Sequence, residues 1–354
     1  MQSRNVDLLQ FSVLILWKHE WEHAPDNAGA VGETLKKLVE KEVICMQANG
    51  VALDDSRVQE LAAKATFRDY MSIMKWGITI ANLLAAFAGM WVASHGHPSP
   101  LALLFTLVGT ALVVAGGAAL NNYYDRDIDQ VMDRTKHKRA VAQGKVAPGA
   151  ALAIGLSMSA VGLGVLYFFI DWQAAACAFV GLFVYSYLYT VWFKRHTTLN
   201  TVLGGVSGAM PPLIGWAAGS GGSLGLGAWA LFFTFFLWQP PHFLPLAMKK
   251  TEDYRAAGIP MLPVVRGFRE TKRQIVIYTA AMVPVSLMLT TLHYEGWIYF
   301  VVMAVLGLIF LVQAIRGLFV PADQDLIWAN KVFRFSLVYL MALCIVLVVS
   351  VSIL

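Results

Sequence analysis

Residues 101–120 read LALLFTLVGTALVVAGGAAL, and residues 121–139, which follow directly, read NNYYDRDIDQVMDRTKHKR. The first segment contains no charged residue, whereas the second places four aspartates within nine residues and continues with basic side chains. An apolar run of about 20 residues is long enough to cross a bilayer as a helix. The stretch therefore predicts a membrane helix that ends in a cluster of carboxylates, and such acids are candidate functional residues.

The composition of the whole chain agrees with a membrane protein. Of its 354 residues, 58% are hydrophobic and only 14% are charged, against roughly 25% charged in soluble domains. Nine apolar runs are long enough to span a bilayer. They lie near 71–94, 99–121, 149–169, 172–193, 198–218, 226–247, 273–292, 296–315 and 332–353. The sequence therefore predicts an all-α, polytopic membrane protein with nine transmembrane helices.

The distribution of basic residues predicts the orientation of these helices. All 27 Lys and Arg residues lie in the N-terminal segment or in alternate connecting loops, and the loops around 95–98, 170–171, 219–225 and 293–296 contain none. Lys and Arg concentrate in cytoplasmic loops. The N-terminus is therefore expected in the cytoplasm and the C-terminus outside. The net charge of +5 then reflects topology and anion binding, so no nucleic-acid partner is expected.

The first 65 residues are expected to lie outside the helical bundle. Their apolar run LLQFSVLILW (8–17) is too short to span a membrane, and the rest of the segment is typical of short amphipathic helices. We interpret 1–65 either as a cytosolic N-terminal extension with a helical structure of its own or as an extension of little consequence. Residues 66–354 then form the transmembrane domain.

The acidic cluster has the spacing of one helix face. Asn121, Asp125 and Asp129 are four residues apart, so they lie along one side of a helix end, and Asp127 points away from them. Oxygen ligands from one or two carboxylates, completed by phosphate and water oxygens, are what Mg²⁺ prefers. The following basic run supplies charge for phosphates. The alternative interpretation is a solvated loop that merely follows the positive-inside rule.

A second polar loop, 238–267, lies on the same predicted side of the membrane and also combines acidic with basic residues. His242 stands at the inner mouth of the sixth apolar run, directly after two prolines, which are expected to interrupt the helix. Two acidic and basic clusters that face one compartment are what a diphosphate with bridging Mg²⁺ requires.

Five motifs resemble the intramembrane prenyltransferase superfamily and, within it, the branch of protohaem IX farnesyltransferases. The superfamily mark, an Asn followed by two aspartates at spacings of four, is matched by Asn121, Asp125 and Asp129. The marks of the branch read DRDIDQVMDRT (125–135), TTLNTVLGG (197–205), GAMPPLIGWAA (208–218), WQPPHFLPLA (238–247) and DYRAAGIPMLPVVRG (253–267). The resemblance covers residues 66–354.

The resemblance implies a fold and an activity. The fold is one helical bundle that encloses a central cavity, with the active site at its cytosolic face, in a bacterial plasma membrane. The activity is transfer of the farnesyl group of farnesyl diphosphate to a vinyl group of protohaem IX (haem B), which gives haem O and diphosphate. Mg²⁺ is the implied cofactor, and a downstream haem A synthase or terminal oxidase is an implied partner.

The resemblance also implies roles for individual residues. The catalytic set comprises Asn121, Asp125, Asp129 and Asp253, of which the first three hold the metal. Diphosphate binding falls to Arg134, Lys138, Arg139, Lys249 and Lys250, with either Lys138 or Arg139 in the place of a family arginine. His242 is the candidate for contact with haem.

Two alternatives remain open on the sequence. One is a prenyltransferase that uses an aromatic or quinone-precursor acceptor, because the aspartate motif fits it equally well. The other is a membrane protein that binds haem or transports a substrate without catalysis. A transporter is expected to show internal repeats and helices broken at mid-membrane, whereas here the acids lie at helix ends.

Overall fold

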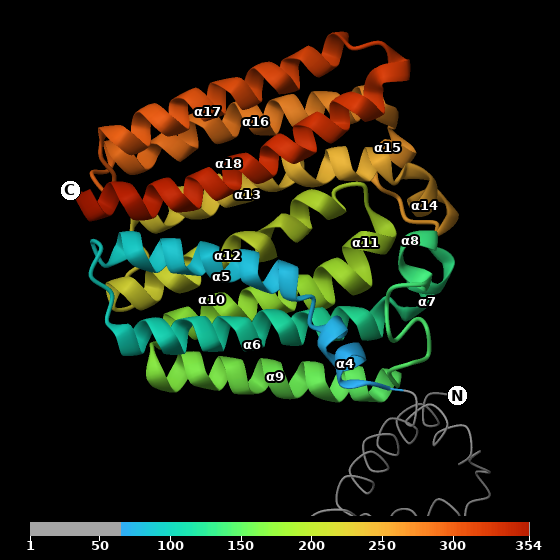
Figure 1. Cartoon of the computed structure of the whole chain (residues 1–354), viewed down its shortest axis with the longest axis horizontal. Helices are drawn as coiled ribbons and strands as arrows, with labels where there is room; N and C mark the ends of the chain where they lie inside the picture. The colour runs from blue at the N-terminus through green and yellow to red at the C-terminus, as the bar shows by residue number, and fades with distance from the viewer. Residues whose placement is uncertain (1–64, 354) are drawn as a thin grey trace, which may run out of the picture.

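The computed structural model describes residues 65–353, and the predicted helices of the first 65 residues lie almost wholly outside this range. The described part is entirely helical and contains no strand. Its long helices run side by side (Figure 1). They are α5 (Trp76–Ala93), α6 (Pro100–Tyr124), α9 (Pro148–Phe169), α10 (Trp172–Phe183) with the π-helix Val184–Phe193 and α11 (Lys194–His196), α12 (Asn200–Ser220), α13 (Leu226–Lys249), α16 (Gly267–Thr291), α17 (Trp297–Arg316) and α18 (Asp325–Ile353).

Seven membrane-spanning candidates in the described part are long and apolar enough to cross a bilayer, so the chain is an integral, multi-pass membrane protein. The helices α12 and α13, which contain 21 and 24 residues, are not among these seven. Both carry internal prolines and buried polar side chains such as Asn200 and Gln239. Large apolar side chains, Leu104, Phe168 and Leu308 among them, are exposed along the outer surface, as expected where helices face lipid.

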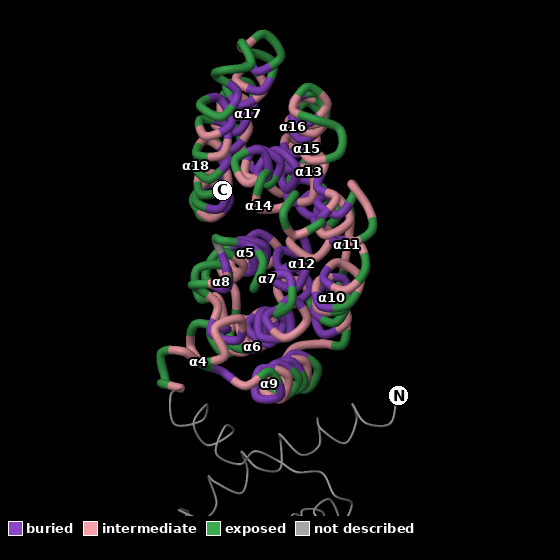
Figure 2. Tube along the Cα trace, turned by 90° about the vertical axis from the view of Figure 1, so that its right-hand side faces the viewer, coloured by how far each residue is buried: buried purple, intermediate pink, exposed green. Residues whose placement is uncertain are grey.

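The long helices form two neighbouring groups. In Figures 1 and 2, α5, α6, α9, α10 and α12 form one group, and α13, α16, α17 and α18 form the other. Contacts of α12 with α13 and of α5 with α18 join the two groups.

The remaining short helices gather at one end of the bundle, at the right in Figure 1, and the C-terminus lies at the opposite end. They are α4 (Phe67–Ile73), α7 (Arg126–Val131), α8 (Asp133–Lys136), α14 (Thr251–Ala256) and α15 (Leu262–Val265), with the 3₁₀ turns Gly317–Phe319 and Ala322–Gln324 completing the set between α17 and α18.

Small residues let the helices of the first group approach closely. A Cβ atom at Gly215 of α12 would lie 1.8 Å from the carbonyl oxygen of Ala86 in α5, and one at Gly162 of α9 would lie 2.7 Å from that of Gly109 in α6. In a membrane, helices associate through such close packing because lipid tails are as apolar as the side chains. These glycines therefore fix the framework from which the end of α6 projects.

Two helix boundaries differ from the sequence-based prediction. The first apolar run, 71–94, is divided at Lys75, whose backbone is left-handed (φ 48°) between α4 and α5. The expected interruption of the sixth run is wrong, because α13 continues through Pro240 and Pro241 to Lys249. Neighbouring helices cover this stretch of α13, where both prolines are buried, and packing of this kind lets membrane helices retain proline.

Candidate active site

The acidic cluster lies where α6 gives way to α7, at the end of the bundle that carries the short helices. Backbone hydrogen bonds from Asp125 to the Asn121 carbonyl (3.0 Å) and from Asp129 to the Asp125 carbonyl (2.8 Å) carry the helical path across the junction. The three side chains therefore share one face, and each is buried, with 3%, 0% and 1% exposure for Asn121, Asp125 and Asp129. The Nδ2 atom of Asn121 donates to Oδ2 of Asp125 at 2.8 Å.

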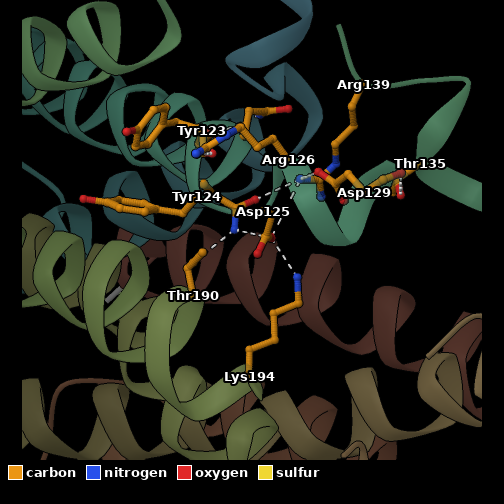
Figure 3. Close-up of polar contacts among 12 residues, drawn as sticks. Tyr123, Tyr124, Asp125, Arg126, Asp129, Thr135, Arg139, Thr190 and Lys194 are labelled. Carbon is orange, nitrogen blue, oxygen red and sulfur yellow. Dashed lines mark hydrogen bonds and ion pairs between the residues drawn. The ribbon is translucent and has the colours of Figure 1, made fainter. Parts of the chain in front are cut away.

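Basic side chains from two other segments meet these carboxylates, as Figure 3 shows. Lys194, at the start of α11, donates to Oδ2 of Asp125 at 2.7 Å. Arg139, from the loop after α8, donates to Oδ2 of Asp129 at 2.6 Å and to Oδ1 of Asn121 at 3.2 Å. Burial nevertheless raises the pKa of Asp129 above its ordinary value, although the charge of Arg139 acts in the opposite direction.

Lys75 completes the basic side chains around the cluster. Its Nζ atom donates to Oδ1 of Asn121 at 2.6 Å and to the hydroxyl of Tyr185 at 3.3 Å. Burial lowers the pKa of Lys75 well below its ordinary value, and the neighbouring charge of Arg139 lowers it further. The left-handed backbone at Lys75 separates the directions of α4 and α5, and it places this side chain at the mouth of the bundle.

The π-helix Val184–Phe193 shapes the wall opposite the aspartates. Thr190 donates to the carbonyl of Tyr185, five residues earlier, at 2.8 Å and accepts from Nδ2 of Asn121 at 3.0 Å. The rings of Tyr185 and Tyr189 are stacked, with centroids 6.2 Å apart. Lys194 follows directly on this segment. Because π-helical turns shift the register of a helix and are frequent at functional sites, we attribute the placement of Thr190 and Lys194 to it.

Asp127 faces away from the cluster, as the helical spacing predicts. Its side chain is 59% exposed and forms a two-pronged ion pair with Arg195, at 2.7 and 2.8 Å. Hydrogen bonding to Arg195 lowers the pKa of Asp127 to about 2. Asp127 thus fixes the outer side of the junction and stands apart from the buried face.

The buried face has the chemistry of a magnesium site. The Oδ1 atom of Asp125 is fully enclosed and has no hydrogen-bond partner among the described residues, which is costly for a carboxylate unless a ligand occupies the position. Within residues 65–353 no three His, Cys, Asp or Glu side chains come together as a metal cage. Two carboxylates and an amide oxygen fit Mg²⁺, which takes its remaining ligands from phosphate and water.

The structure distinguishes the basic residues of the loop after α8. Arg139 reaches the buried face, whereas Lys138 is exposed. Of these two residues, only Arg139 is brought to the buried face in the part of the chain that the structure describes. Arg134 lies in α8, and its side chain falls outside the described part of the structure.

The second polar loop packs against the first through apolar side chains. Ile128 and Met132 from the α7 and α8 region join Ala247, Ile259 and Met261 in one buried cluster, and α14 lies beside α7 and α8 in Figure 1. The loop also carries Lys250 and Asp253, whose charged atoms are 3.9 Å apart. This pair belongs to the same end of the bundle, and among the described residues it does not contact the carboxylate of Asp125.

The remaining predicted residues lie between α13 and α18. Lys249 donates to Oδ1 of Asn330 at 2.7 Å, so its side chain turns to α18 and is not brought to the aspartates. His242 is 9% exposed and contacts Ser336 of α18.

The sequence prediction did not assign Lys75 or Lys194 to the site. The available signal was a lysine at the end of an aromatic-rich apolar run, as in YSYLYTVWFK (185–194).

The model of the UbiA prenyltransferase family matches residues 82–338. A protoheme IX farnesyltransferase of Alkalihalophilus pseudofirmus is 48% identical over 301 residues, which cover 83% of this chain and 93% of the relative. The enzyme of the same name from Exiguobacterium sibiricum is 48% identical over 316 residues, 86% of this chain and 99% of the relative. Protoheme IX farnesyltransferase 2 of Bacillus subtilis is 42% identical, with coverage of 85% and 98%.

Solved structures of the same fold include two informative neighbours. One is a structure whose description concerns the biosynthesis of digeranylgeranylglyceryl phosphate synthase in membranes. It aligns with a TM-score of 0.69 at 19% identity, over 81% of this chain and 99% of that one. A UbiA homologue from Archaeoglobus fulgidus bound to DMAPP and Mg²⁺ aligns with a TM-score of 0.57 at 17% identity, over 78% and 99%. At such identities the likeness concerns the fold.

Proposed function

The chain belongs to the UbiA prenyltransferase family, and from that premise we propose that it transfers the farnesyl group of farnesyl diphosphate to a vinyl group of protohaem IX, giving haem O and diphosphate. Three curated relatives at 42–48% identity that bear the corresponding enzyme name support the choice of acceptor. The chain covers nearly the whole length of each relative.

One observation carries the proposal: a buried face of two aspartates and one asparagine, surrounded by three basic side chains. Among the side chains that the structure describes, the set contains one basic group more than it has carboxylates. Burial and the charge of Arg139 lower the pKa of Lys75, and a bound diphosphate would favour its protonated form. With Lys75 protonated, a divalent cation and a diphosphate ester, which carries about three negative charges, would bring the whole close to neutrality. A site of this composition, enclosed at the mouth of an apolar bundle, suits an apolar chain with a diphosphate head.

We propose that one set of residues holds the metal and that another set holds the diphosphate oxygens. Asn121, Asp125 and Asp129 would hold Mg²⁺, whose chemistry when bound is to neutralise charge on the departing diphosphate. We propose that Arg139, Lys194 and Lys75, which donate to the side chains of the buried face, also donate to diphosphate oxygens. Lys250 and Asp253, from the second loop, are proposed to close the site from the other side. Preorganised donors of this kind stabilise the leaving group in a water-poor site.

The reaction balances with water as the third reactant. The bond between the allylic farnesyl carbon and the diphosphate oxygen breaks, and the electron pair leaves with the diphosphate. The terminal carbon of the haem vinyl forms the new carbon–carbon bond. Water adds to the other vinyl carbon and loses a proton, which leaves a hydroxyethylfarnesyl group. We propose that the stacked rings of Tyr185 and Tyr189 stabilise positive charge on the allylic carbon.

The topology follows from the same proposal. All nine long helices, α12 and α13 included, would span a bacterial plasma membrane, with the site at the cytosolic face and the C-terminus outside. The support is the distribution of Lys and Arg together with the position of the short helices and the C-terminus at opposite ends of the bundle.

We propose that the product is consumed by a reaction that oxidises haem O further or by an oxidase that incorporates it.

The test is a reconstituted assay with the purified full chain, farnesyl diphosphate and Mg²⁺, in which haem B competes with 4-hydroxybenzoate as an aromatic acceptor. We expect farnesylated haem alone, and its formation should stop when EDTA removes the metal. Farnesylation of the aromatic acid in preference to haem would replace the proposed acceptor, and formation of neither product would overturn the proposal.

A further inference from the structure

The imidazole of His242 is clamped between two aromatic side chains. Its ring stacks on Trp238 of the same helix, with centroids 4.5 Å apart and planes at 17°, and on Phe333 of α18, at 4.9 Å and 28°. Both faces of the ring are thereby covered, and its orientation is fixed. Only the edge of the ring that carries the nitrogens remains for polar contacts.

Ser336 determines which nitrogen of His242 carries the proton. The single hydroxyl proton of Ser336 is donated to the carbonyl oxygen of Phe333 at 2.7 Å. The Ser336 oxygen, 2.8 Å from Nδ1 of His242, is therefore free to act as an acceptor, and Nδ1 donates to it. In a neutral imidazole a proton on Nδ1 leaves a lone pair on Nε2. Ser336 also accepts, through its carbonyl, the indole N–H of Trp238 at 2.9 Å.

The second nitrogen of His242 is available to a ligand. Nε2 has no hydrogen-bond partner in the described part of the chain, and unlike Oδ1 of Asp125 it is not a fully enclosed atom. The described contacts of the ring are aromatic residues and one hydroxyl, and none is a carboxylate that would stabilise an imidazolium. An oriented imidazole with its other nitrogen hydrogen-bonded is the usual form of a metal ligand.

A basic side chain lies on the same side of α13, towards the inner end. Lys249 follows His242 by seven residues, which is nearly two helical turns, so both lie on one face about 10.5 Å apart along the axis. The Nζ atom of Lys249 lies 5.6 Å from the centre of the Phe333 ring, the ring that also covers His242. A neutral ligand atom and a cation thus line one strip between α13 and α18.

We propose that this strip binds the haem acceptor, with Nε2 of His242 as the iron ligand, Ser336 as the positioning residue that fixes its tautomer, and Lys249 paired with a propionate. The inference rests on the proposed function, because it places the substrate of that reaction. It also assigns different basic side chains to the two substrates. Arg139, Lys194 and Lys75 bind the diphosphate, and Lys249 binds the acceptor.

The first experiment titrates the purified full chain in detergent with ferric haem B and follows the absorption spectrum. Substitution H242A should abolish the spectrum of the imidazole-ligated haem, and added imidazole should restore it. Iron-free protoporphyrin IX should bind wild type and H242A equally, because the contact is made through iron. The matched control is H196A, since His196 also lies at the inner end and bonds a carbonyl through Nδ1 at 2.8 Å; it should leave the spectrum unchanged. An unchanged spectrum in H242A would overturn the iron-ligand assignment.

The second experiment tests Ser336 as a positioning residue. Substitution S336A should weaken binding of ferric haem by roughly ten- to hundredfold, the usual effect of losing a partner of a metal ligand, and should shift the spectrum. S336T, which keeps the hydroxyl, should restore both. Binding of farnesyl diphosphate should be equal in all three proteins, which shows that they are folded. Wild-type haem affinity in S336A would overturn the positioning role.

The third experiment uses the dimethyl ester of haem B, which lacks the propionate charges. Wild type should bind haem more tightly than the ester, and K249Q should bind the two equally. A preference that persists in K249Q would remove Lys249 from the acceptor site. The proposed function is judged separately: a protein that forms haem O but fails these tests refutes only the placement of the haem, whereas a protein that binds haem as predicted and forms no haem O refutes the function.

Discussion

At the residue scale, the spacing of Asn121, Asp125 and Asp129 was sufficient to predict that they share a face, because four-residue spacing is a local property of a helix. The cations around them could not be assigned in the same way. Lys75 and Lys194 come from segments 46 and 69 residues from their partners Asn121 and Asp125, and only the packing of the bundle brings them together. Their charges in the sequence are equally consistent with membrane topology.

The two aspartates Asp125 and Asp127 give a matched test of the metal face. Asp125→Ala removes a buried carboxylate with one unpartnered oxygen, and we expect turnover to fall by roughly a hundredfold or more. Asp127→Ala removes an exposed partner of Arg195 and should change turnover by only a few-fold. Steady-state rates in detergent, with Mg²⁺ varied, measure both. Equal losses in the two variants would contradict the division of the helix into two faces.

Arg139 and Lys138 form a second matched pair. Arg139→Gln removes a charged hydrogen bond to Asp129 at 2.6 Å and a proposed donor to the diphosphate. A charge-assisted hydrogen bond contributes about 1.5–3 kcal/mol, so kcat/KM for farnesyl diphosphate should fall roughly ten- to hundredfold while the KM for haem changes little. Lys138→Gln alters an exposed side chain and should behave as wild type. If Lys138→Gln were the more damaging, the assignment of Arg139 would be wrong.

At the scale of elements, the existence of the apolar helices follows from their length, but several of their boundaries and their register do not. The division at Lys75, the continuation of α13 past its prolines and the π-helix Val184–Phe193 each depend on neighbours. A left-handed residue, a missing backbone donor or a shifted hydrogen-bond register is tolerated only where adjacent helices satisfy or cover the backbone. Sequence periodicity does not predict which helices pack against these positions.

The close contact of α12 with α5 predicts a large difference between two glycines. A Cβ atom at Gly215 would clash with the carbonyl of Ala86 at 1.8 Å, whereas one at Gly164 of α9 meets nothing within 4 Å. Gly215→Ala should lower the free energy of unfolding by about 1–3 kcal/mol through overpacking, and Gly164→Ala should leave it equal or higher because alanine favours helix. Thermal unfolding in detergent measures both. A destabilised Gly164→Ala with an unchanged Gly215→Ala would contradict the packing.

The connection between α16 and α17 contains a buried acid that should make stability depend on pH. Glu295 is 3% exposed, and burial raises its pKa from 4.5 to about 8. The folded state therefore favours the protonated carboxyl, so this contribution to stability is complete below about pH 4.5 and is lost as the pH rises through about 8.

Replacement of Glu295 by glutamine should remove that dependence. The Tm of Glu295→Gln should match wild type near pH 5 and exceed it near pH 9, as measured by thermal unfolding in detergent. Glu252, an exposed acid that pairs with Arg255, provides the control, and Glu252→Gln should keep the wild-type profile. A wild-type Tm that rises between pH 5 and pH 9 relative to Glu295→Gln would contradict the sign of the effect.

At the scale of the whole molecule, the sequence predicted an all-helical membrane protein, and this is confirmed. The number of membrane spans depends on α12 and α13, because these two helices combine the length of a membrane helix with buried polar side chains. Asn200, Gln239 and His242 are buried in these two helices, and such residues lower mean hydropathy while they line the inside of the bundle. The packing of the two polar loops against each other could not be predicted either, because the buried cluster that includes Ile128, Ala247 and Ile259 is not evident from either loop alone.

The central claim is that this bundle joins a farnesyl group to haem, and mass spectrometry of the haem extracted from cells that express the chain tests it most directly. Cells that lack a haem farnesyltransferase of their own should yield haem B alone, and expression of wild type should add a species heavier by one farnesyl group and one hydroxyl group. Expression of Asp125→Ala at equal membrane levels should not. A haem pool that stays at the mass of haem B with wild type present in the membrane would contradict the account.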